Sequence, residues 1–119
     1  MEESILETIR GMVGPDVNYD AFDVDLVTHI NTYLGVLNQL GIGKMGFTIE
    51  DSDARWSDFL DKEDMTNGIY NSVKSYLYMK VKLVFDCPAN ATLVQSLKDQ
   101  SEEIAWRLKE QREYDLYGG

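Results

Sequence analysis

The sequence is poor in the residues that build covalent and metal centres. Its 119 residues include one cysteine, Cys87, and one histidine, His29. A single cysteine excludes an internal disulfide and any zinc site made of several cysteines. The two residues fall on different predicted elements, so no cysteine–histidine pair for nucleophilic catalysis is expected. Beside Pro88, Cys87 is expected to be a small buried residue, and His29 a structural histidine at the edge of an apolar stripe.

Long hydrophobic runs are also missing. No segment is long and apolar enough to span a bilayer, and the beginning, MEESILETIR, is acidic and lacks the apolar run of a signal peptide. We therefore expect a soluble protein of intracellular origin without membrane contact. Residues 1–119 suffice for a single domain that folds around one core without disulfides.

Positive charge is scarce. The chain has 11 Lys and Arg against 21 Asp and Glu, which gives a net charge of −10 and a pI near 4.4. This balance argues against nucleic-acid binding through phosphates, which needs a basic patch. A basic partner, a cation and a surface that repels DNA are all compatible with it.

Motifs for catalysis and ion binding fail on spacing or residue type. Residues 41–46 resemble a phosphate loop, but the spacing to Gly-Lys and the following residue both depart from the Walker pattern. Residues 16–20 begin like a calcium loop, but Ala21 and Val27 occupy the positions that need glycine and glutamate. An acidic run, best interpreted as a solvated loop, consists of Asp51, Asp53, Asp58, Asp61, Glu63 and Asp64. No catalytic residue, cofactor or metal site is predicted.

Apolar residues that recur every three and four positions predict an all-α fold with four main helices. The first opens at Ser4, with Glu7 in capping-box position, and ends at residues 14–15. The second begins near residue 20 or 23 and runs to about residue 40, where glycines stop it. The last opens at Thr92. Together they predict a small domain resembling a four-helix bundle.

The central helix is expected to begin near Asp64 or Thr66. Its wide apolar face lies along residues 69–86. The helix stops before Pro88, because a proline disfavours helical geometry in the residue before it. Lys80 falls within its wide apolar face and should either snorkel to the rim or meet a buried carboxylate. The core positions predicted over all helices are Leu26, Ile30, Leu34, Leu37, Val73, Tyr76, Leu77, Val84, Leu97 and Ile104.

Residues 41–65 are predicted to form a long irregular arm between the second and central helices. Residues 46–50 alternate like a short strand or hairpin arm, and residues 54–60 resemble a helix of one or two turns. A connection of this length in a compact domain is typically functional or ordered by a partner.

Aromatic residues outside the stripes are candidates for interfaces. Trp106 projects from the acidic side of the last helix, which favours an interface residue over a chance surface residue. Residues 113–119 are expected to be a frayed tail. The interface candidates are Trp106, Phe47, Ile49, Trp56, Tyr114 and Tyr117.

Taken in order, several stretches resemble a known family. They are FDVDL and HIN in residues 22–31, LNQLG at 37–41, GFTI at 46–49, WSDFL at 56–60, YLYMKVKLVFDCP at 76–88 and WRL at 106–108. This series is similar to the head–tail connector proteins of long-tailed bacteriophages, also called adaptor or head-completion proteins. None of the motifs is catalytic, so their order carries the resemblance. Where other members have a second proline after the central helix, this chain has Cys87 before Pro88.

The resemblance implies a structural virion protein at the head–tail interface, assembled in the bacterial cytoplasm. Its helical subunits would form a ring of about twelve copies under the portal protein and dock a stopper or tail-completion protein. The arm would reach a neighbouring subunit or the stopper. DNA would pass through the ring without specific binding, because an acidic channel does not attract phosphates.

Two other classes of function compete with this interpretation. An acidic regulatory binder, such as a DNA mimic, would occupy a basic partner protein, but its acidic residues should gather on one face. A small metal-dependent enzyme would use the carboxylates of residues 51–64 and should bind divalent cations tightly.

Overall fold

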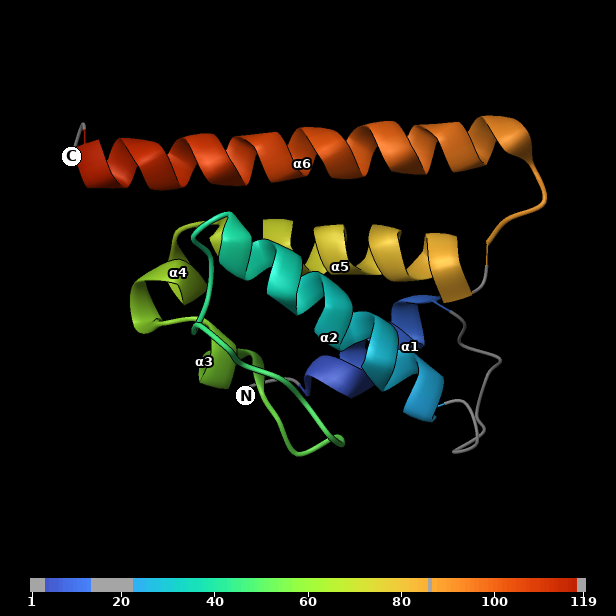
Figure 1. Cartoon of the computed structure of the whole chain (residues 1–119), viewed down its shortest axis with the longest axis horizontal. Coiled ribbons are helices and arrows are strands. Elements are labelled where there is room, and N and C mark those ends of the chain that lie inside the picture. Colours follow the sequence, from blue (N-terminus) through green and yellow to red (C-terminus); the bar gives the residue numbers. More distant parts are fainter. Residues whose placement is uncertain (1–3, 14–22, 86, 118–119) are drawn as a thin grey trace.

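The computed structural model describes residues 4–13, 23–85 and 87–117, with the backbone alone at residues 23 and 114–117. The helices are α1 Ile5–Val13, α2 Asp23–Gln39, α3 Trp56–Phe59, α4 Lys62–Thr66, α5 Ile69–Phe85 and α6 Ala91–Tyr117 (Figure 1). The described part contains no strand, so the all-α prediction is confirmed and the strand expected at residues 46–50 is wrong. The predicted stop at residues 14–15 and the calcium-like residues 16–20 lie outside the described residues.

The helix beginnings follow from side-chain caps. Ser4 Oγ accepts a hydrogen bond from the Glu7 backbone N–H at 3.3 Å, as its capping position predicts. At α6 the cap is Asn90, whose Oδ1 accepts from Leu93 N at 3.1 Å. The predicted start at Thr92 was therefore too late, because asparagine is the stronger capping residue and lies just before it.

Glycines set two helix boundaries. Gly41 and Gly43 follow α2 with φ values of +87° and +80°, a left-handed backbone that glycine adopts without steric cost. Gly68, at φ +91°, separates α4 from α5. The central helix therefore begins at Ile69, not near Asp64 or Thr66, and the residues before it form a short helix of their own.

α5 is the central element of the fold. The helices α1, α2, α4 and α6 all pack against it. In Figure 1, α6 lies antiparallel to α5 along one edge of the molecule, and α2 crosses in front. α5 directs its buried face at these neighbours through Ile69, Val73, Tyr76, Leu77 and Val81.

The predicted core positions divide into three groups by their burial. Those that the structure buries are Leu26, Ile30, Leu34, Leu37, Val73, Tyr76, Leu77 and Leu97, and Ile104 is partly buried beside the core. Val84 is 47% exposed, which corrects its assignment to the core. It lies in the last turn of α5, at the end of the bundle. Met12 in α1 and Leu93 in α6 are also exposed near helix ends.

Three other predicted environments can be compared with the structure. Cys87 is exposed, so its interpretation as a buried residue is wrong. His29 is half-buried and packs edge-on against Phe85, with ring centroids 6.4 Å apart. Lys80 is also half-buried, and its Nζ lies 5.9 Å from the centroid of the Tyr76 ring. That position agrees with a snorkelling lysine that gains a weak cation–π contact.

Candidate interaction surfaces

One face of α6 is fixed to the domain. Leu97 and Leu108 are 7% and 3% exposed, and between them Ser101 is completely buried. A serine at this position lets α6 approach closely, and its Oγ donates a hydrogen bond to the Lys98 carbonyl at 3.0 Å. α6 therefore presents one apolar face to α5 and leaves the opposite face to solvent (Figure 1).

An ion pair holds the C-terminal half of α6. Arg112 Nη2 lies 2.8 Å from Asp64 Oδ2 in α4, and the two side chains are 22% and 6% exposed. The arginine chain also crosses Gly41, where an added Cβ would lie 2.9 Å from Arg112 Cγ. The pair borders a cavity of about 430 Å³ with Lys44 and Phe59 on its wall. The sequence does not reveal this pair, because Asp64 belongs to the predicted solvated acidic run and no spacing connects residues 48 positions apart.

Trp106 occupies the opposite face of α6. Its side chain is 62% exposed, in agreement with its predicted place outside the apolar stripe. A helix advances 100° per residue, so Trp106 lies half a turn away from the line of Leu97 and Leu108. Among the interface candidates whose side chains the structure describes, Trp106 alone is exposed.

Ile49 and Trp56 lie inside the domain, which corrects their selection as interface candidates, whereas Phe47 stays partly exposed beside the core. Ile49 is 2% exposed and Trp56 is completely buried. Phe47 is partly buried and packs on Phe59, with ring centroids 5.4 Å apart. The Trp56 indole N–H faces Thr8 Oγ1 at 3.3 Å, which ties this residue to α1.

Two asparagines of α2 fix residues 42–49 to the domain. The Asn31 side chain forms a pair of hydrogen bonds with the backbone of Ile49, donating to its carbonyl at 2.9 Å and accepting from its N–H at 2.8 Å. Asn38 donates to the carbonyls of Ile42 and Lys44 and accepts from the N–H of Gly46. This segment is thus a packed part of the subunit rather than an extended arm.

The C-terminal residues continue α6. The helix runs to Tyr117, so its backbone includes residues 113–117 of the predicted tail. The side chains of Tyr114 and Tyr117 lie outside the described residues.

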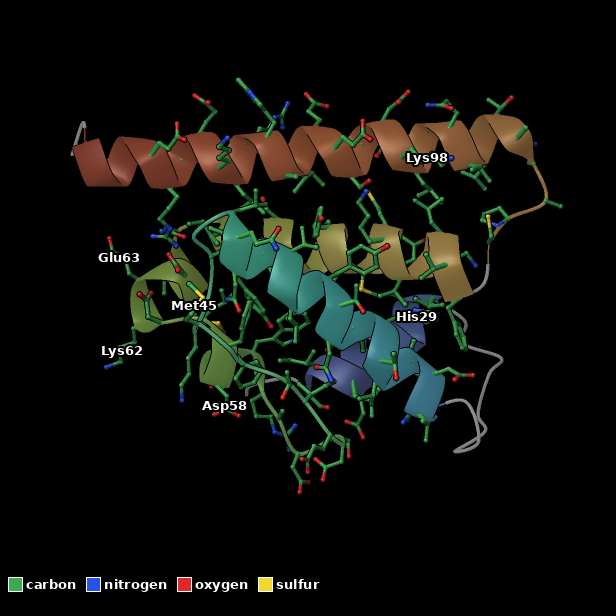
Figure 2. All side chains as sticks on the ribbon, in the orientation of Figure 1. His29, Met45, Asp58, Lys62, Glu63 and Lys98 are labelled. Carbon is green, nitrogen blue, oxygen red and sulfur yellow. The ribbon has the colours of Figure 1, made fainter. Side chains whose placement is uncertain are left out.

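Several carboxylates of the acidic run are used in local structure. Asp58 and Asp61 accept backbone hydrogen bonds from Arg55 and Asp64, both at 2.8 Å. Asp58 and Glu63 point outward in different directions (Figure 2). In the described part of the chain, no three His, Cys, Asp or Glu side chains are grouped so that they could hold a metal ion. The helices described there also include none that is long and apolar enough to cross a membrane.

The chain matches a known protein family. The sequence model of a family described as "Phage connector protein" matches residues 5–115, which is nearly the whole chain. The chain belongs to the phage connector protein family. Comparisons with curated proteins and with solved structures gave no match.

Membership of this family gives the general role of the protein. It is a structural component of a phage particle, of the head–tail connector type, and works through contacts with head and tail components. The family is one of structural proteins rather than of known enzymes. For such a protein, the surfaces exposed on the subunit are the candidate functional sites, and the Trp106 side of α6 is one of them.

Proposed function

We propose that this connector assembles into a ring of about twelve copies beneath the portal protein. The ring extends the DNA channel and offers a platform to a stopper or tail-completion protein. The observation that carries the proposal is the match of the connector family over residues 5–115. Assembly takes place in the cytoplasm of the bacterial host, and the mature location is the head–tail interface of the virion.

The shape of the subunit supports a role in such a ring. α6 has 27 residues, so it is about 40 Å long and spans most of the 44 Å longest dimension of the domain. One face of this helix is held by α5 and by the Arg112–Asp64 pair. The other is a long, firmly supported face on which a neighbour or a portal can bind. Trp106 is the central candidate on it, and Tyr114 and Tyr117 remain candidates near its end.

The net charge of −10 suits a channel through which DNA must slide. Acidic walls remove the phosphate attraction that would hold the duplex. DNA therefore passes through the ring without specific contacts.

Electron microscopy of the connector mixed with portal particles from the same phage genome tests the proposal. We expect an additional ring of density under the portal, with rotational symmetry that can be measured. Portal particles without the connector are the control. Absence of added density, together with binding to host proteins that have basic grooves, would instead support an acidic regulatory binder.

A further inference from the structure

We propose that the outer face of α6 around Trp106 docks on a basic protein surface and takes arginine or lysine side chains on both sides of the indole. This inference deepens the connector function proposed above and rests on it for the biological setting. Binding of cationic side chains to this surface can be tested without portal particles.

The proposal starts from the residues that share a face with Trp106. In a helix, positions three, four and seven residues away lie on the same side. Those six positions are Asp99, Glu102, Glu103, Lys109, Glu110 and Glu113. All six side chains are exposed, and we call them, with Trp106, the Trp106 face. Figure 2 shows polar side chains along the edge of α6 that faces away from α5.

The Trp106 face is unlike an ordinary solvated helix surface because it combines strong charge of one sign with a large exposed ring. Five of its six charged residues are acidic. Glu103 forms an ion pair with Arg107, with 2.7 Å between Oε1 and Nη2. Both side chains are well exposed, so the pair contributes little energy and a partner can compete for Glu103. Trp106 is 62% exposed, and tryptophan is the residue type most enriched at the energetic centres of interfaces.

The carboxylates restrict what can cover the ring. A partner wide enough to bury Trp106 must also cover residues one turn away, among them Glu102 and Glu110. An apolar partner would strip water from these carboxylates without replacing its hydrogen bonds, which is unfavourable. A nucleic acid would add like charge. A surface that carries guanidinium or ammonium groups satisfies the carboxylates and also stacks favourably on the indole face.

The spacing on α6 gives the geometry of the partner. Glu102 and Glu110 are eight residues apart, so they are separated by about 12 Å along the helix axis, with Trp106 midway between them. The indole leans toward the N-terminal side of its own position, as long side chains on helices do. The partner should therefore present two cationic groups about two helical turns apart, with a shallow recess for the ring between them.

Nuclear magnetic resonance of the full chain tests the chemistry directly. The protein has two tryptophans, and Trp56 is completely buried, so two indole N–H signals report two environments. The Trp106→Phe variant assigns the exposed one. The probe is a helical peptide with arginines two turns apart, and its control has glutamine in place of arginine. We expect the arginine peptide alone to shift the Trp106 signal and leave the Trp56 signal in place.

Charge variants locate the binding. In Glu102→Gln/Glu110→Gln the dissociation constant for the arginine peptide should rise at least about threefold, since each exposed ion pair contributes a few tenths of a kcal/mol or more. The matched control, Glu50→Gln/Asp53→Asn, removes the same charge from exposed loop positions and should leave the constant unchanged. Added salt should weaken binding of the original chain more than that of the first variant. A Trp106 signal that does not move, or that moves equally with the glutamine peptide, overturns the proposal.

The same variants, measured against portal particles, separate this proposal from the proposed function. Trp106→Ala should weaken portal binding about 30-fold if the indole is an interface centre. One outcome would keep the connector function and refute the docking role of the Trp106 face. In it, portal binding is tight and unchanged by Trp106→Ala and by the charge variant, and the arginine peptide does not shift the Trp106 signal. A peptide response without any portal binding supports the surface chemistry and contradicts the portal as partner. Self-association abolished by Trp106→Ala, with no arginine-peptide response, would show that a second copy is the occupant and refute the basic partner.

Discussion

Replacing Gly43 by alanine tests whether residues 42–60 are a packed part of the subunit. Gly43 has a φ of +80°, and a Cβ added there would overlap the Phe59 ring, which is 2% exposed. Gly46 offers a matched control. Its φ is +77°, almost the same, but an added Cβ would meet no atom within 4 Å. The two substitutions therefore share the backbone cost and differ in the clash alone.

The expected losses in the free energy of unfolding follow from these two terms. A left-handed backbone costs a non-glycine residue about 1–2 kcal/mol, which is the full loss expected for Gly46→Ala. At Gly43 the buried Phe59 ring must also move, and overpacking of a core costs about 1–3 kcal/mol more. Gly43→Ala should therefore lose about 2–5 kcal/mol in total. A domain of 119 residues has a stability of roughly 6–18 kcal/mol, so both variants should still fold.

Urea unfolding followed by circular dichroism measures both values. The denaturation slope should stay constant, so that the shift in midpoint reports stability. Equal losses for the two variants, within about 0.5 kcal/mol, would show that Phe59 does not pack on Gly43 in solution. In that case the loop would be free to act as the extended arm that the sequence suggested.

Two further predictions concern buried polar groups. Burial, with the nearby Tyr33 phenol, raises the pKa of Tyr76 from 10.0 to about 12. The unfolded chain then loses this proton first, so stability is complete below pH 10 and falls by about 2–3 kcal/mol as the pH rises to 12. Urea unfolding on both sides of pH 10 should show this fall, and Tyr76→Phe should remove it. For the ion pair, Asp64→Asn should cost about 2 kcal/mol, between values for exposed and buried pairs. A double-mutant cycle with Arg112→Met, which keeps the alkyl chain over Gly41, should give a coupling of about 1 kcal/mol, and a value near zero would contradict the pair.

Local features of the sequence determined the helices of this connector. The three- and four-residue repeat of apolar side chains depends on neighbours within one turn, so it identified α2 and α5 without knowledge of the fold. Glycines with a left-handed backbone ended α2 where predicted. The same periodicity showed that Trp106 lies outside the apolar line, and its exposure follows.

The errors at helix ends have a physical origin. Periodicity cannot show where neighbouring helices stop covering a face, so Val84, in the last turn of α5, was wrongly expected in the core. Periodicity also does not show which of two neighbouring residues caps a helix. The residue that caps α6 is Asn90, not Thr92. The boundary at Gly68 was missed because residues on both sides of it are helical.

Only the tertiary structure shows how residues 41–65 pack on the domain and which contacts hold α6 in place. Asn31 meets Ile49 across 18 residues, and Arg112 meets Asp64 across 48. Neither partner is marked by spacing or composition, because such pairs form only when separate helices have packed. The sequence by itself determined where the main helices lie and that Trp106 stays outside the core. Tertiary packing held the expected arm against the domain through the buried Ile49, Trp56 and Phe59 and left the face around Trp106 open, because burial depends on neighbours that are distant in the chain.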